Sequence, residues 1–260
     1  MPVEDTLLDI GAHGVRMAEV FLNTFSEYED GFCDLLCERV KRANLSVYSV
    51  HPMSTQFEPQ LFSRHDRQRG DAEKIYRQVL KCGARLGATV YVMHGAAFLS
   101  GATKNIRMAR NIDVSRLAES LLRLSGMAAD FGVTLTLENV SWCVFSRPET
   151  GAALSAALGD QLHYTLDIKQ AIRAGQDPLA FVDALGSRIV NLHLCDAKTA
   201  PDGTVSLAMP GRGNFDFARL KARMDELGCT GPAFMEVYND MYGDVSELYA
   251  SYARMQEIFA

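Results

Sequence analysis

Seven short runs of apolar and β-branched residues recur along the chain, and they constrain its fold more than any other feature. Each run is rich in Val, Ile, Leu, Thr or Tyr, as strands buried in a parallel sheet are. Longer segments with helical periodicity separate the runs, and this alternation predicts βα units with right-handed crossovers. The predicted strands are 16–22, 46–52, 89–95, 133–139, 163–168, 189–196 and 233–238.

Apolar residues in the intervening segments repeat with the period of a helix. Segments 71–87, 113–132 and 216–228 each place apolar residues on one stripe. Leu117 and Leu121, for example, share a face. Each segment ends on a glycine, which is typical of a helix C-cap. Helix, glycine and strand therefore form a recurring unit.

The number of strands bears on the fold class, because a (β/α)8 barrel needs eight. Here a predicted helix over 3–14 leads directly into the run 16–22, so the strand expected first is absent. We predict an α/β fold of the (β/α)8 TIM-barrel type that lacks its first β-strand: either the chain starts late, or the barrel is incomplete. A doubly wound open sheet is the alternative, but the G-x-G-x-x-G turn typical of it does not occur.

Length and composition predict one domain over 1–260, because α/β barrels of this size form single units. The net charge of −6 does not favour a nucleic-acid partner. No basic, apolar leader and no run long enough to cross a membrane occurs. The six cysteines contain no C-x-x-C pair and are expected to be reduced thiols, so we predict a cytoplasmic protein without a membrane partner.

Six of the seven predicted strands carry, at or near their carboxyl ends, a residue that can bind a metal ion or transfer a proton. In parallel α/β folds these ends meet at one rim, where active sites form. Taken alone, a glutamate there is more often a solvated or helix-capping residue, and a histidine a packing residue. Their repetition favours a shared site. The residues are His51, His94, Glu138, Asp167, His193 and Glu236.

The last four of these residues suggest a metal site. Three neighbouring carboxylates repel one another and raise each other's pKa, and a divalent cation removes that repulsion. An oxygen-rich set suits Mn²⁺ or Mg²⁺, whereas the imidazole keeps Zn²⁺, Co²⁺ and Fe²⁺ possible. One divalent ion, with Mn²⁺ first, is therefore expected.

The motifs around these residues resemble the xylose isomerase-like TIM-barrel superfamily, and most closely its sugar phosphate isomerase/epimerase group. They are "TLEN", "TLDIKQA", "NLHLCDAK", "PGRGNFDF" and "FMEVY", and the resemblance covers residues 3–257. It implies that Glu138, Asp167, His193 and Glu236 are the metal ligands. Gln170 and Thr199 stand where ketose 3-epimerases have histidine and arginine, and "SLAMPGRG" lacks the Asp-x-His of endonuclease IV. One metal is therefore expected, and a specific 3-epimerase is in doubt.

The resemblance also implies a reaction. A sugar, sugar phosphate or polyol-ketone would be isomerised or epimerised by proton transfer through a metal-stabilised enediolate. Glu138 and Glu236 would act as acid and base, and His51 and His94 would bind hydroxyls or relay protons. Trp142 and Phe145 could form an apolar lid, and Lys198 and Arg212 could hold an anionic group. The predicted substrate-binding residues are Asn139, Trp142, Gln170, Lys198 and Arg212.

Other functions remain open at this point. A dehydratase or lyase acting on a cyclic keto-polyol or keto-acid would use the same metal chemistry. A non-catalytic, barrel-like partner subunit would need no ligand quartet, and an endonuclease IV-like nuclease is less favoured. A barrel without its first strand would expose strand edges, so we also predict a homo-oligomer that covers the gap.

Overall fold

The computed structural model describes residues 1–97, 113–202 and 204–259. These described residues form two compact units, the first drawn from the ranges 1–137 and 157–162 and the second from 138–156 and 163–260. The single domain predicted for the whole chain stays a prediction. No helix in the described ranges is both long and apolar enough to cross a membrane.

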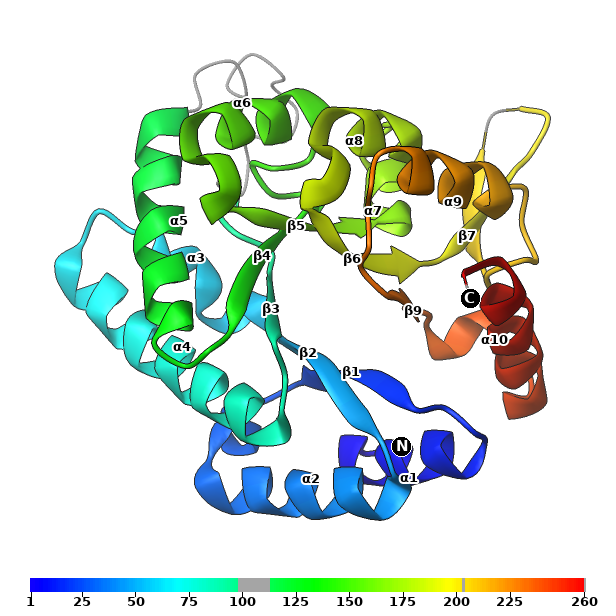
Figure 1. The fold of residues 1–260 in the computed structure, drawn as a ribbon, viewed down its shortest axis with the longest axis horizontal. Coiled ribbons are helices and arrows are strands. Elements are labelled where there is room, and N and C mark those ends of the chain that lie inside the picture. The colour runs from blue at the N-terminus through cyan, green and yellow to red at the C-terminus, as the bar shows by residue number, and fades with distance from the viewer. Residues whose placement is uncertain (98–112, 203, 260) are drawn as a thin grey trace. The chain divides into compact units, whose positions relative to one another are not determined.

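The first unit alternates helices with four parallel strands in the order β1-β2-β3-β4 (Figure 1). The predicted helix at the start of the chain is present, and a strand follows it directly. The main elements are α1 (Val3–Ala12), β1 (Met17–Leu22), α2 (Asp30–Ala43), β2 (Ser46–Pro52), α3 (Glu58–Leu61), α4 (Asp66–Leu86), β3 (Val90–Met93), α5 (Val114–Ala129) and β4 (Thr134–Glu138).

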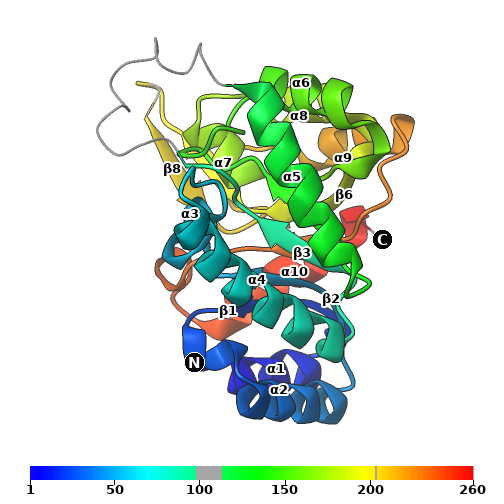
Figure 2. The ribbon, with the colours of Figure 1, turned by 90° about the vertical axis from the view of Figure 1, so that its left-hand side faces the viewer.

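Helix packing in the first unit follows the apolar stripes of the sequence. α1 and α2 lie side by side (Figure 2). α4 ends at Gly87, whose φ of 86° closes the helix in the left-handed conformation that glycine adopts without strain. Leu117 and Leu121 on α5 are both buried. The predicted stripes therefore form part of the core of this unit.

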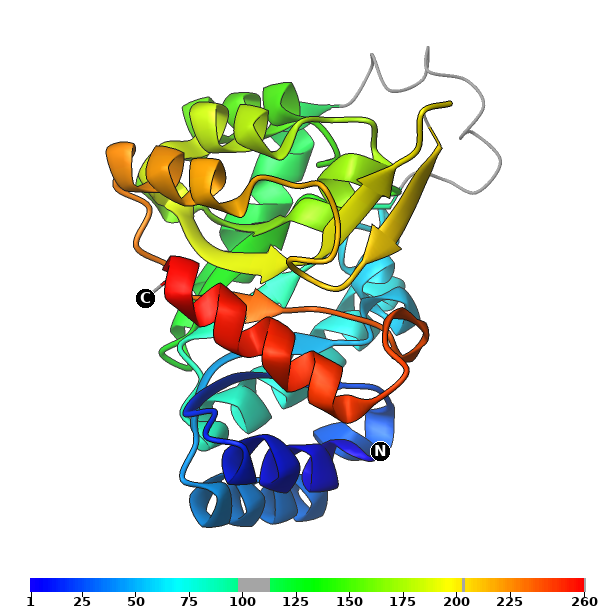
Figure 3. The ribbon, with the colours of Figure 1, turned by 90° about the vertical axis from the view of Figure 1, so that its right-hand side faces the viewer.

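The second unit holds three parallel strands in the order β5-β6-β9 and an antiparallel hairpin, β7–β8, which the sequence analysis missed (Figure 3). The predicted strand 189–196 is divided, because β6 ends at Leu194 and Asp196 begins β7. The main elements of the second unit are α6 (Pro148–Leu158), β5 (His163–Asp167), α7 (Ile168–Arg173), α8 (Pro178–Leu185), β6 (Ile189–Leu194), β7 (Asp196–Thr199), β8 (Val205–Ala208), α9 (Phe217–Glu226), β9 (Ala233–Met235) and α10 (Val245–Phe259).

Across the described residues, the strands with parallel partners number seven, as the sequence predicts. All seven predicted runs contain one of them. Strands β3 and β9 are shorter than predicted, with four and three residues. The alternation of helices and parallel strands confirms the predicted α/β class.

Candidate metal centre

Four predicted ligands, all residues of the second unit, stand at or beside the ends of strands. Glu138 is the last residue of β4, and Asp167 is the last residue of β5. His193 is the last residue but one of β6, and Glu236 directly follows β9. The strand-end pattern of the sequence therefore corresponds to real strand ends.

Backbone register brings these ends together. Asp167 pairs with His193 across β5 and β6. The backbone N–H of Glu236 donates to the Leu194 carbonyl at 3.0 Å, which extends the pairing of β9 with β6 by one residue. As a result, each of Glu138, Asp167, His193 and Glu236 offers one ligand atom, and these atoms lie within 4.8 Å of one another.

The His193 ring nitrogen Nδ1 lies at the centre of the four-residue group. It is 2.9 Å from Glu236 Oε2, 3.5 Å from Glu138 Oε1 and 3.9 Å from Asp167 Oδ2. Glu138, Asp167 and His193 are buried, whereas the Glu236 side chain is 29% exposed. One side of the group is therefore accessible from solvent, through Glu236.

The local electrostatic environment shifts the pKa values of two of the carboxylates, Asp167 and Glu236, in opposite directions. Burial, and then the charge of Glu236, raise the pKa of Asp167 well above its usual value. Burial also opposes ionisation of Glu236, but His193 and the Lys169 ammonium outweigh it and hold the pKa of Glu236 below its usual range. Carboxylates forced close together in this way are suited to share a cation.

The chemistry of the donor set fits a divalent metal ion. Lys169 Nζ lies 3.3 Å from Asp167 Oδ2, but this buried oxygen accepts no hydrogen bond within the described residues, although such an atom ordinarily accepts one. It lies on the side of the carboxylate that faces His193. Three carboxylates and one imidazole are ligands that Mn²⁺, Zn²⁺ and related ions accept. Glu138, Asp167, His193 and Glu236 would hold the ion.

Asn139 and Gln170, predicted to bind substrate, both contact Asp167. The Asn139 amide hydrogen-bonds the backbone of Asp167. The Gln170 backbone N–H donates to Asp167 Oδ1 at 2.9 Å, and Gln170 Oε1 accepts from the Ser141 hydroxyl at 2.9 Å. Asn139 therefore holds the backbone of Asp167, the Gln170 backbone N–H holds its carboxylate, and the Gln170 side chain holds the loop after β4. Contact of Asn139 and Gln170 with substrate stays a prediction.

Asn191 supports His193 from β6. Its side-chain nitrogen lies 3.3 Å from His193 Nε2. An amide N–H donates, so Nε2 is the acceptor in this contact, which helps to hold the ring with Nδ1 toward the carboxylates. Asn191 is fully buried, so this contact is shielded from water.

The glycine-rich turn 210–217 is held by the buried carboxylate of Asp196. Its oxygens accept backbone N–H groups from four residues, at 2.7–3.1 Å. A side chain at Gly213 would overlap this carboxylate, so glycine is required there. Lys198 on β7 and Arg212 in the turn are both exposed, so either can meet an anionic group from solvent. The four donors are Ala197, Gly211, Gly213 and Phe215.

The apolar lid predicted after β4 is wrong for one of its two residues. Phe145 is buried, and its ring packs 5.2 Å from Tyr164 and 5.9 Å from Phe181, between centroids. It belongs to the core of the second unit because its ring packs against Tyr164 of β5 and Phe181 of α8. Trp142 is partly exposed, and its predicted contact with substrate stays a prediction.

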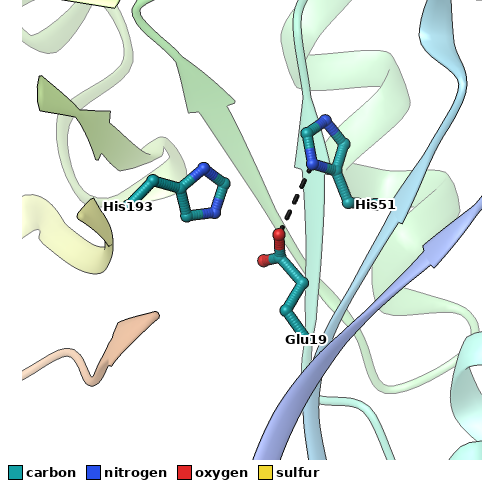
Figure 4. Close-up of side chains that lie close together, drawn as sticks. All are labelled: Glu19, His51 and His193. Atoms are coloured by element: carbon teal, nitrogen blue, oxygen red, sulfur yellow. Dashed lines mark ion pairs between the residues drawn. The ribbon is translucent and has the colours of Figure 1, made fainter. Parts of the chain in front are cut away.

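The predicted catalytic residues His51 and His94 lie in the first unit, where they contact each other. Their Nε2 atoms are 2.8 Å apart. His51 Nδ1 lies 3.4 Å from the Glu19 carboxylate, which points at the ring (Figure 4). The Ser49 hydroxyl donates to the other Glu19 oxygen at 2.6 Å. Carboxylate, imidazole and imidazole thus form a chain along which a proton can be held or passed.

A second carboxylate of the first unit, Glu58, is fully buried. It accepts from the Tyr91 hydroxyl at 2.8 Å and from the His94 backbone N–H at 2.9 Å. Burial raises the pKa of Glu58. Glu58 therefore fixes the backbone at which His94 leaves β3.

Sequence reasoning missed several of these polar residues. Glu19 is a carboxylate inside an otherwise apolar strand, and this exception in the sequence could have indicated a site residue. Lys169 follows Asp167 by two residues, but a lysine at a helix start carries no signal of burial. Asn191 and Asp196 flank His193 within one motif, and only their contacts separate them from ordinary loop or strand residues.

The chain belongs to the xylose isomerase-like TIM barrel family, whose sequence model matches residues 5–256. This membership confirms the predicted TIM-barrel class. Among curated relatives, "Uncharacterized protein ML2432" of Mycobacterium leprae is 44% identical over 79 residues, which cover 30% of this chain and 28% of that protein. Fructoselysine 3-epimerase of Shigella flexneri is 26% identical over 163 residues, which cover 61% and 58%. The chain thus spans only part of the length of these relatives.

Solved structures show the same fold. A D-psicose 3-epimerase from Clostridium cellulolyticum H10, solved with D-tagatose, matches with a TM-score of 0.77 and 16% identity over 100% of this chain and 94% of that one. The IOLI protein, solved with a bound zinc atom, matches with a TM-score of 0.73 and 16% identity over 97% and 90%. At this identity the likeness shows the fold alone.

Proposed function

We propose that this protein is a divalent-metal-dependent isomerase or epimerase of a sugar, a sugar phosphate or a polyol-ketone. The observation that carries the proposal is the convergence of Glu138, Asp167, His193 and Glu236, whose ligand atoms lie within 4.8 Å of one another. The sugar epimerases among the relatives and structural neighbours support it.

The chemistry divides between the ion and the side chains. A bound divalent ion, with Mn²⁺ as first candidate and Mg²⁺, Co²⁺, Zn²⁺ or Fe²⁺ as alternatives, would act as a Lewis acid toward the charge that develops on the substrate. Glu236 is partly exposed, so its carboxylate can meet a substrate and accept the proton next to the carbonyl. Glu138, buried beside His193, can return a proton as the partner acid.

Other predicted residues keep supporting roles in the proposal. His51 and His94 would bind hydroxyls or relay protons, for which their direct contact suits them. Lys198 and Arg212 would hold a phosphate or carboxylate of the substrate, and their exposure supports this. Trp142 would contact the sugar.

Elemental analysis of the purified protein is the first test. We expect about one divalent ion per chain in the wild type, in line with a single four-ligand site, and loss of that ion in His193→Ala. His65→Ala, which removes an exposed histidine of the first unit, is the matched control and should retain the ion. No ion in the wild type, with no gain on adding Mn²⁺, would favour the non-catalytic partner subunit instead.

Isotope exchange then tests the reaction. With Mn²⁺ present, ketoses and inososes in heavy water should gain deuterium next to the carbonyl, and Glu236→Gln should abolish the exchange while the protein stays folded. Loss of water from the substrate without epimerisation would point to the dehydratase or lyase alternative. Absence of both reactions across the panel would count against the proposal.

The oligomeric state and location form a lesser part of the proposal. Within the described part of the first unit, β1 pairs with β2 alone, which leaves one strand edge to cover. We therefore expect a homo-oligomer, and a monomer by light scattering would contradict this. None of the six cysteines forms a disulfide, which supports a cytoplasmic location.

A further inference from the structure

Lys169 is a fully buried cation within the ligand group, and the proposed reaction gives it no role. Its Nζ lies 2.7 Å from Glu236 Oε1 and 3.3 Å from Asp167 Oδ2. It also donates to the Tyr238 hydroxyl at 3.2 Å and lies 4.9 Å from the centroid of that ring. Lysine is almost never fully buried unless it is paired, and here the two carboxylates provide that pairing.

The formal charges of the group show what this cation does. The three carboxylates of Glu138, Asp167 and Glu236 carry −3 when ionised, and the ammonium reduces this to −2 with a neutral imidazole. A divalent ion would bring the sum to zero. The ammonium lies 2.7 Å from Glu236 Oε1 and 3.3 Å from Asp167 Oδ2, and opposite charges at these distances favour its charged form. The ammonium therefore stays charged beside the carboxylates.

The geometry lets two cations share the same carboxylates. Lys169 binds Glu236 Oε1, whereas Glu236 Oε2 faces His193 Nδ1. Asp167 Oδ2 lies 3.3 Å from the ammonium and 3.9 Å from His193 Nδ1, so it faces both. Glu236 thus binds the resident cation with one oxygen and presents the other to the group's centre, whereas Asp167 presents one oxygen, Oδ2, to both.

We propose that Lys169 is a resident counter-cation that competes with the divalent ion for Asp167 and Glu236 and so sets the metal affinity of the site. It neutralises part of the carboxylate charge before an ion arrives, which keeps the metal-free site folded. It also weakens the electrostatic attraction between the carboxylates and a divalent ion, so that a bound ion can dissociate and exchange with ions in solution. The inference rests on the metal site of the proposed function, and not on the identity of the reaction.

Metal titration of Lys169→Met tests this. After removal of metal with a chelator, Mn²⁺ binding is followed by the electron paramagnetic resonance of free Mn²⁺ at one fixed, near-neutral pH. We expect Lys169→Met to bind Mn²⁺ at least about tenfold more tightly than the wild type, because one positive charge next to the ligands is gone. Lys74→Met, which removes an exposed lysine paired with Asp71 on α4, is the matched control and should bind as the wild type does.

A second readout follows from the same charge. Metal-free Lys169→Met should melt at a lower temperature than the wild type, and Mn²⁺ should stabilise it more than it stabilises the wild type. If the metal-free variant does not fold, Lys169→Met and Lys169→Gln can be purified with Mn²⁺ and challenged with chelator. Both should then release the ion more slowly than the wild type.

The outcomes separate this inference from the proposed function. If wild type and Lys169→Met each bind one ion with equal affinity, or if the variant binds more weakly or releases the ion faster, the counter-cation role is wrong and the metal site stands. If neither folded protein binds Mn²⁺, Co²⁺ or Zn²⁺, the proposed metal site itself is overturned.

Discussion

The side-chain amide of Asn139 hydrogen-bonds the backbone of Asp167 at two points. Asn139 Oδ1 accepts from the Asp167 N–H at 2.6 Å, and Asn139 Nδ2 donates to the Asp167 carbonyl at 2.9 Å. Both groups are buried. Because Asn139 directly follows Glu138, this pair of bonds sets the spacing between two of the proposed metal ligands.

Removing this amide should loosen the metal site. Asn139→Ala leaves the N–H and the carbonyl of Asp167 without their partner, so we expect the free energy of unfolding to fall by about 2–4 kcal/mol. Mn²⁺ affinity should fall by about 10–100-fold, as it does when groups behind the ligands are removed. Chemical denaturation and metal titration check the two effects.

The control for this prediction is Asn214→Ala. Asn214 also accepts from a backbone N–H, that of Thr199 at 3.1 Å, but it is exposed. It should change stability by no more than about 0.5 kcal/mol and leave metal affinity unchanged. Equal losses in the two variants would contradict a special role for Asn139.

The contact of Asn191 with His193 predicts an effect on metal binding. Asn191→Leu keeps the approximate volume but removes the polar group that helps to hold the His193 ring in its orientation, so Mn²⁺ affinity should fall by about 10-fold or more. Thr165→Val removes another partner of the Asn191 amide and should leave affinity nearly unchanged. The prediction fails if Asn191→Leu, correctly folded, binds the ion as the wild type does.

The Asp196 carboxylate predicts a large stability effect away from the metal ligands. In Asp196→Asn, one acceptor oxygen becomes an amide donor that faces backbone N–H groups, so the free energy of unfolding should drop by about 2–4 kcal/mol. Asp202→Asn, in the exposed β7–β8 loop, is the control and should change it by no more than about 0.5 kcal/mol. Urea denaturation measures both, and a drop no larger than that of the control would show that the turn does not depend on this carboxylate.

Burial of Glu58 predicts a dependence of stability on pH. Its pKa is raised in the folded state, so above the unfolded pKa the folded protein binds more protons than the unfolded chain. The contribution of Glu58 to stability therefore falls as pH rises from its unfolded pKa to its folded pKa, with a slope of at most about 1.4 kcal/mol per pH unit.

Glu58→Gln removes this titration. Its free energy of unfolding, relative to that of the wild type, should rise as pH increases through the same window, even though the amide disturbs the bond with Tyr91 or His94. Urea denaturation of both proteins across a series of pH values gives the difference. A constant difference would show that the Glu58 carboxyl does not titrate between its two pKa values.

The sequence alone was sufficient to place the seven parallel strands, but not the hairpin β7–β8 or the end of β6. Apolar periodicity distinguishes strands from helices because the two place side chains at different angular intervals. All seven parallel strands fall within predicted runs, and Asp167 and Glu138 were correctly placed at strand ends. Short β-branched runs also mark where a parallel sheet is buried, so the fold class followed from the same pattern.

Tertiary structure decided what surrounds those strand ends. Lys169 and Phe145 lie close in sequence to predicted site residues. Lys169, however, is a buried cation paired with Glu236, whereas Phe145 packs in the hydrophobic core. Burial and pairing depend on which atoms long-range folding brings within a few ångströms, and local sequence does not encode those distances. The hairpin β7–β8 was missed because each of its strands has only four residues, half of the eight are exposed, and so short a pattern does not predict a strand.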